Sequence, residues 1–172
     1  MWPKTLTKLA LCVAIACAAG PGFAQSQGNG SGNGSGNGNG RPLHIDIDTA
    51  IDFGIAAQQG NVASGAIELD PTTGVRRVTG GLVAVGGNYF SGQARLTGQP
   101  FARVRIVLPT SVKMNARQGS KAVVASFTAD VPSVVTLDAN GTLLFNFAGR
   151  VSVNPGEEGE FKGRFAITAD YE

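Results

Sequence analysis

Hydrophobic and polar positions alternate along much of this chain, and the alternation is clearest in residues 160–171. The odd positions of this stretch suit a surface that faces a core: Phe161, Gly163, Phe165, Ile167, Ala169 and Tyr171. The even positions include the charged residues Lys162, Arg164 and Asp170. A period of two predicts a β-strand with one buried and one solvated face. We expect this last strand to take a further partner from earlier in the chain or from another molecule.

The same pattern predicts a first strand over residues 43–53, ended by Gly54. Its odd positions are mostly apolar: Leu43, Ile45, Ile47, Thr49, Ile51 and Phe53. Its even positions include His44, Asp46, Asp48 and Asp52. The first strand is therefore expected to be amphipathic along its whole length.

Turn residues separate the short strands that lie between these two. Pro71 and Gly74 predict a hairpin of residues 66–70 and 75–79, because proline fixes φ at the first turn position and glycine accepts a positive φ. Asn140-Gly141 predicts a second hairpin, of residues 134–137 and 142–153.

Two further strands have faces that the pattern predicts. In residues 101–108 the inward side chains are expected to be Val104, Ile106 and Leu108. In residues 121–129 one face is expected to carry Val123, Ala125 and Phe127. No segment has apolar residues at helical spacing over three turns. Seven or more short strands joined by turns predict an all-β fold, an antiparallel β-sandwich.

Residues 1–24 have the composition of a secretory signal peptide. Lysines without an acid come first, an apolar run follows over residues 9–19, and small residues end the segment. The run is shorter than the roughly 20 residues that span a bilayer, so no membrane span is expected. We expect an exported protein in the periplasm, outside the cell or on its surface. A second processing route would attach a lipid to Cys17, although Ala14 stands where lipoprotein signals normally have leucine.

Residues 25–42 are predicted to be a flexible linker and residues 43–172 a single domain. Glycine occupies every even position from 28 to 40, with Asn or Ser between, so the tract has no apolar side chain to bury. Both cysteines, Cys12 and Cys17, lie in the signal, so the domain is expected to have no disulfide. Removal of Lys4 and Lys8 also removes the formal charge of +2, which leaves no electrostatic reason to expect nucleic acid or anionic membrane as a partner.

No catalytic, cofactor or metal site is predicted. His44 is the only histidine, and it lies on a polar strand face, whereas a catalytic triad needs a buried and oriented histidine. Asp46, Asp48 and Asp52 share that face and could contribute to a calcium site. Because no glycine-turned calcium loop accompanies them, a solvated face is the expected interpretation.

Two other groups of residues could bind a ligand. Arg103 and Arg105, with Arg95 on the strand before them, could form a basic stripe on one outer sheet. Tyr89 and Phe90, next to two glycines, could present aromatic rings to a sugar. For both groups the simpler expectation is structural, with the arginines on a solvated face and the aromatic rings in the core or at its rim.

Three motifs occur in order along the domain: Ile51-Asp52-Phe53-Gly54, Asp70-Pro71-Thr72-Thr73-Gly74 and the final stretch 159–171. Together they resemble an uncharacterised family of secreted bacterial domains that looks related to the Mat/Ecp-type fimbrial major subunits. The resemblance covers residues 43–171, with Ile51 in place of the usual Leu and Phe161 in place of the usual Tyr. It implies an Ig-like, pilin-like sandwich and strand addition between identical or related subunits.

These observations lead us to expect a non-enzymatic, secreted or cell-surface structural protein, such as a fimbrial or adhesion-related subunit. The alternative is a monomeric periplasmic or extracellular binding module for a carbohydrate or a protein. Residues 43–53 decide between them, because residues 25–40 have no apolar side chain with which to fill another subunit. They either pair within their own chain, giving the closed monomer that we favour, or fill the groove of a neighbour.

Overall fold

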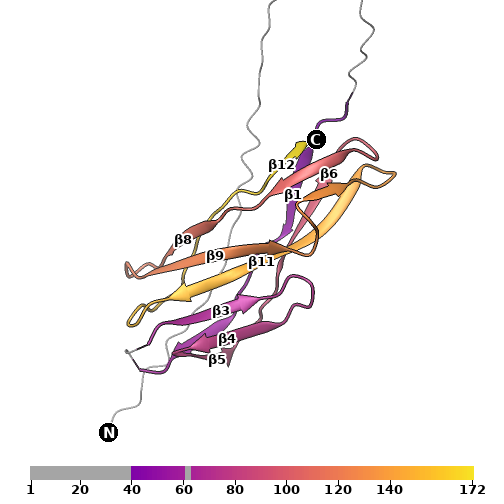
Figure 1. Ribbon diagram of the computed structural model, residues 1–172. Helices are drawn as coiled ribbons and strands as arrows, with labels where there is room; N and C mark the ends of the chain where they lie inside the picture. Colours follow the sequence, from indigo (N-terminus) through magenta and orange to yellow (C-terminus); the bar gives the residue numbers. More distant parts are fainter. Residues whose placement is uncertain (1–39, 61–62) are drawn as a thin grey trace, which may run out of the picture.

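The computed structural model describes residues 40–60 and 63–172, and each regular element in them is a β-strand (Figure 1). The expected signal peptide and nearly all of the expected linker lie outside these residues. In chain order the strands are β1 (His44–Thr49), β2 (Ile55–Gln58), β3 (Gly65–Leu69), β4 (Arg76–Gly80), β5 (Leu82–Gly86), β6 (Gly92–Thr97), β7 (Arg103–Val107), β8 (Ser111–Asn115), β9 (Lys121–Ala129), β10 (Val134–Thr136), β11 (Thr142–Val153) and β12 (Thr168–Tyr171).

The strands form three sheets, and every pairing is antiparallel. The largest sheet runs β1-β6-β11-β3-β4, with β9 also on β11 and β8 on β9. The order β10-β7-β12 makes a second sheet, and β2 and β5 make a third. The elongated body in Figure 1 encloses one apolar core between these sheets. The predicted all-β antiparallel sandwich is therefore confirmed.

Strand β11 joins the parts of the fold. Its first half pairs with β6, from Thr142 opposite Thr97 to Phe147 opposite Gly92. Its second half pairs with β3, and β9 pairs with residues 147–153. Phe147 has a partner in both β6 and β9, so these two strands occupy opposite edges of β11. The alternating apolar residues of β11 supply a large part of the core.

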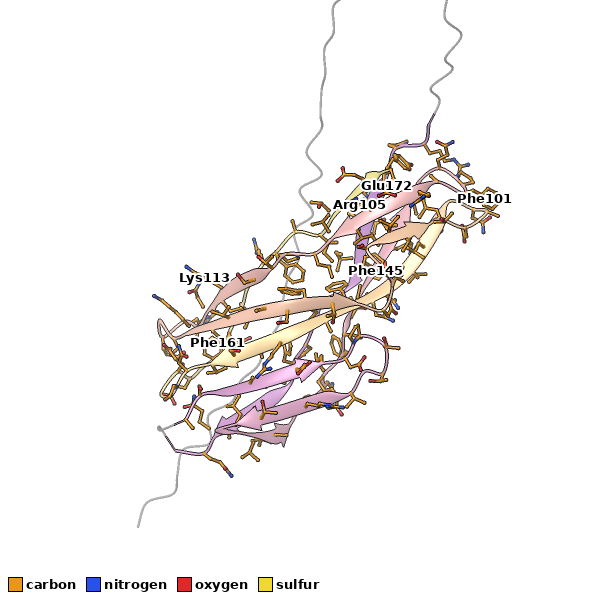
Figure 2. The ribbon with its side chains drawn as sticks, in the orientation of Figure 1. Phe101, Arg105, Lys113, Phe145, Phe161 and Glu172 are labelled. Carbon is orange, nitrogen blue, oxygen red and sulfur yellow. The ribbon has the colours of Figure 1, made fainter. Side chains whose placement is uncertain are left out.

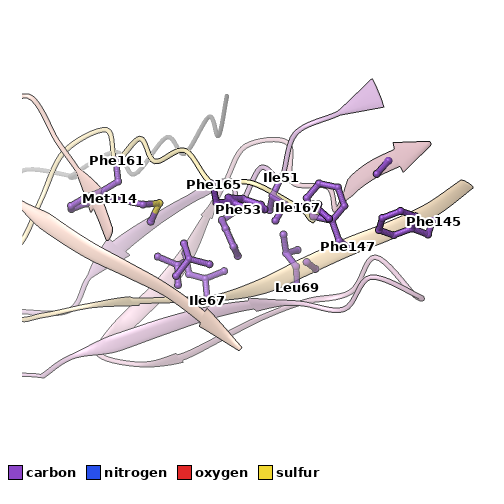
Figure 3. Packing of buried hydrophobic residues seen from close by; sticks show 14 of the residues in the cluster. Ile51, Phe53, Ile67, Leu69, Met114, Phe145, Phe147, Phe161, Phe165 and Ile167 are labelled. Atoms are coloured by element: carbon purple, nitrogen blue, oxygen red, sulfur yellow. The ribbon is translucent and has the colours of Figure 1, made fainter. Parts of the chain in front are cut away.

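The core is built mainly from phenylalanine and branched aliphatic side chains (Figure 3). Phe165 lies 4.7 Å from Phe127 and 6.0 Å from Phe147 between ring centroids, the second pair at 88°. Edge-to-face rings place the positive edge of one ring on the negative face of the other. The C-terminal segment is thus held on the core by aromatic contacts.

The predicted last strand is a regular strand only at its end. Residues 168–171 pair with β7, and Lys162 forms an isolated bridge with Asn115 of β8. Phe161, Phe165 and Ile167 are buried as the alternation predicted, although the residues between the bridge and β12 have no ladder. The inward face was therefore predicted well, except that Tyr171 is 41% exposed at the rim.

The predicted common face of residues 121–129 is wrong. Ala122 and Val124 are buried, Val123 is 40% exposed, and yet Phe127 packs on the core. The reason is a β-bulge, in which the ladder to β11 shifts register and Ser126 takes φ = 52°. The extra residue of a bulge exchanges the two faces of the strand beyond it.

The second predicted hairpin is also wrong, although its turn exists. The N–H of Asp138 donates to the carbonyl of Thr142, and Gly141 has φ = 76°. However, β10 pairs with β7, whereas β11 pairs with β6. The chain therefore passes between two sheets at this turn. The first predicted hairpin, β3 and β4 around residues 71–74, is confirmed.

Candidate functional site

The residues singled out for catalysis or metal binding have local partners. His44 Nε2 lies 3.0 Å from Asp46 Oδ1, and both side chains are more than half exposed. Asp48 pairs with Arg95 at 2.9 Å, and Asp52 accepts the N–H of Gly54 at 2.8 Å. Among residues 40–60 and 63–172, no three His, Cys, Asp or Glu side chains are grouped as a metal site requires.

The structure does not bring the three arginines of the predicted basic stripe together. Arg95 lies on β6 in the large sheet, whereas Arg103 and Arg105 lie on β7 in the sheet of β10 and β12. Arg103 and Arg105 both form ion pairs with the carboxylate of Glu172. Figure 2 labels Arg105 and Glu172 next to each other. The two β7 arginines thus hold the end of the described chain against the sheet.

One candidate site is the seam between β1 and β12. Each strand lies at the edge of its sheet, and the two are in contact, but no ladder joins them. Strand β1 follows β6 from His44 opposite Thr97 to Thr49 opposite Gln93. The inward side chains of β1, Ile45 and Ile47, are only partly buried, and so is Leu43 just before the strand. Strand β1 is therefore held by its hydrogen-bond ladder to β6 and by apolar side chains that are only partly buried.

A tyrosine closes this seam at the N-terminal end of β1. The hydroxyl of Tyr171 donates to the carbonyl of Arg41 at 2.6 Å and accepts the N–H of Gln99 at 2.8 Å. It links the residues before β1, the turn after β6 and the end of β12. No pattern of alternation could have predicted this link, because a hydroxyl at a strand end has no characteristic spacing.

The second candidate site is a groove between β4 and β5. These strands are joined at Gly81 but do not pair, since β4 bonds to β3 and β5 bonds to β2. The groove has a volume of about 440 Å³ and a mainly apolar lining that includes Val78, Leu82 and Val83. An opening of this size is in the range of small-molecule sites.

Arg76 and Tyr89 line the same groove. The guanidinium carbon of Arg76 lies 5.2 Å from the centre of the Tyr89 ring, within cation–π distance. Arg76 Nη2 donates to the carbonyl of Ile55 at 2.8 Å, and Nη1 lies 3.4 Å from the carbonyl of Gly86. Partial burial lowers the pKa of Arg76 from its usual value. The arginine is charged and held in place.

The aromatic residues suggested for sugar binding are exposed. Tyr89 is 47% exposed and Phe90 is 43% exposed, so neither is a core residue. A short bridge between Asp52 and Phe90 fixes the backbone beside them. Sequence reasoning found Tyr89 but missed Arg76, because a single arginine in a hairpin strand has no distinguishing pattern.

Comparison with known proteins gives one result. The model of a family described as a domain of unknown function (DUF4402) matches residues 43–171. No curated protein and no solved structure gives a significant match. In the part of the chain that the structure describes, no helix has the length and apolarity to cross a membrane.

Proposed function

The chain belongs to the DUF4402 family of domains of unknown function, and on that premise we propose that it is a non-enzymatic structural subunit. It is exported to the cell envelope or beyond, and it assembles with identical or related subunits by exchanging its first strand. The resemblance to Mat/Ecp-type fimbrial subunits supports a pilin-like role for the sandwich. Strand β1 pairs with its own β6, which is the closed form that the sequence favoured. In this proposal the closed chain is the form that exists before assembly.

The attachment of β1 is the observation that carries this proposal. A ladder to β6 and partly buried side chains at Ile45 and Ile47 hold the strand. In an exchanged assembly the same ladder and the same apolar contacts form between two chains. Exchange of an identical element therefore costs little free energy once the strand has been released.

A disulfide across β1 and β6 provides the test. Asp46 and Arg95 are register partners on the outer face, and paired residues in an antiparallel ladder have Cα separations that a disulfide can span. The mature chain is expected to have no other cysteine, so an oxidised D46C/R95C variant locks β1 in its own chain. The matched control is E68C/R77C, which locks β3 to β4 and leaves β1 free.

Light scattering and SDS gels of unboiled samples measure the outcome. Wild type and the oxidised control should form ladders of subunits that collapse on boiling. The oxidised D46C/R95C chain should remain monomeric and should assemble after reduction. A wild-type protein that is monomeric at all concentrations, or a locked variant that assembles equally well, would overturn the proposal and favour the monomeric binding module.

A further inference from the structure

The backbone around Gly54 holds Arg76 in a fixed position. Gly54 has φ = 71°, and a Cβ at this position would collide with Nη1 of Arg76. The carboxylate of Asp52 fixes the turn by accepting the N–H of Gly54. The glycine of the motif Ile51-Asp52-Phe53-Gly54 therefore leaves room for the guanidinium of Arg76 beside Ile55.

The fixed guanidinium retains binding capacity. An arginine side chain has five N–H groups. In Arg76, one of them donates a hydrogen bond of 2.8 Å to the carbonyl of Ile55, and a second makes a longer hydrogen bond of 3.4 Å to the carbonyl of Gly86. The remaining N–H groups have no partner among the residues that the structure describes. Rigid arginines are suited to carboxylates, since two parallel N–H groups match the two carboxylate oxygens.

The residues around Arg76 determine which kind of group can lie next to a carboxylate bound to it. The exposed part of the Tyr89 ring offers a flat apolar surface, and Val83 and Leu82 continue it along the groove. The small residues Ala84 and Gly86 keep the groove open. A pyranose ring has one face of C–H groups that packs on such a surface and hydroxyl groups that remain in water.

We propose that the groove of Arg76, Tyr89 and Val83 binds a carboxylated sugar unit of an acidic polysaccharide. The carboxylate lies on Arg76 and the pyranose ring lies against Tyr89. A singly charged group fits better than a phosphate, because Arg76 is the one charged residue among the described residues that line the groove. This site goes beyond assembly, since it is built from β4, β5 and the segment that follows β5, and it uses neither β1 nor β12.

Binding of trigalacturonate tests the proposal, with its methyl ester as the uncharged probe. Calorimetry of the full exported chain should detect trigalacturonate and not the ester. R76Q and Y89A should weaken binding at least tenfold, whereas Y89F, which keeps the ring, should bind as wild type does. The matched control is R77Q, because Arg77 is the next residue on β4, lies on the opposite face and is exposed.

Two further measurements separate binding from folding and from assembly. Amide NMR spectra of each variant show whether it is folded. If R76Q is unfolded, the comparison of Y89A with Y89F decides whether trigalacturonate binds in the groove. The oxidised D46C/R95C chain should bind trigalacturonate as tightly as wild type, whatever its oligomeric state. Absence of binding to wild type, equal binding of the ester, or unchanged binding to folded R76Q or Y89A would overturn the proposal.

Discussion

The hydroxyl of Tyr171 donates a hydrogen bond of 2.6 Å to the backbone carbonyl of Arg41, so the last strand is tied directly to the residues that precede the first. The same oxygen accepts the N–H of Gln99. No ladder joins β1 to β12, so this hydroxyl is a specific polar link across the seam between them.

Replacing Tyr171 by Phe removes both hydrogen bonds and keeps the ring. A net hydrogen bond contributes about 0.5–1.5 kcal/mol, and partial exposure reduces the effect, so we expect a loss of roughly 1 kcal/mol in the free energy of unfolding. Urea denaturation measures it. Y89F is the control, because no hydrogen bond of its hydroxyl is found among the described residues, and its stability should not change. Equal stability of Y171F and wild type would show that the link contributes nothing.

Replacing Phe165 by Ala should have a much larger effect. Phe165 is 8% exposed and contacts the rings of Phe127 and Phe147. Truncation of a buried phenylalanine costs about 3–5 kcal/mol, through lost transfer free energy and the cavity left behind. Phe101 is 70% exposed, so F101A should change the free energy of unfolding by less than about 0.5 kcal/mol. Similar losses in the two variants would contradict the packing of the C-terminal segment.

Replacing Ser126 by glycine should keep or raise the stability of the protein, whereas replacing it by valine should lower the stability. Its φ of 52° is left-handed, a conformation that costs an ordinary residue about 1–2 kcal/mol. Glycine avoids that strain but loses roughly 0.5–1 kcal/mol through its greater freedom in the unfolded chain. We therefore expect S126G to be neutral or more stable by up to about 1.5 kcal/mol, whereas S126V should be clearly less stable. Thermal unfolding checks the order, and a valine variant as stable as S126G would argue against the bulge.

The turn before β4 should make stability depend on pH in acid. The backbone N–H groups of Thr72 and Thr73 donate to the carboxylate of Asp70 and hold its pKa below the usual value. The unfolded chain therefore takes up this proton first as the pH falls. The stabilisation is complete above the ordinary aspartate pKa of about 3.9 and is lost below it, as the pH passes through the pKa of the folded chain.

The difference between wild type and D70A reports this effect. Urea midpoints of the two proteins should differ by a constant amount from pH 5 to pH 7. The difference should shrink as the pH falls below about 4, because the protonated carboxyl no longer attracts the two N–H groups. A difference that stays constant down to pH 2 would mean that Asp70 acts through its shape alone.

The sequence predicted those parts of the fold that depend on regular alternation. The faces of β1 and β7, the burial of Phe161 and Phe165, and the hairpin around residues 71–74 follow from strand period and turn chemistry. Each of these features is local. A strand whose alternation is unbroken, or a turn between two strands that pair with each other, can be predicted from its own residues.

The remaining features depend on partners distant in sequence. The bulge at Ser126 arises where β9 passes Gly149 of β11, and nothing in residues 121–129 marks it. The turn at residues 138–141 has ordinary hairpin chemistry, yet its two strands find partners elsewhere. The position of Arg76 depends on Gly54, a residue two strands earlier. The groove could therefore not be predicted from its own residues.

The central position of β11 has a consequence for the order of folding. Its partners β6 and β3 precede it by about 50 and 85 residues, and pairing over such distances requires closing long loops. Proteins dominated by non-local strand pairing fold in milliseconds to seconds. Until residues 142–153 are available, the large sheet lacks the strand that joins its two halves. The chain should therefore remain unfolded through most of its synthesis and complete its core in one late, cooperative step.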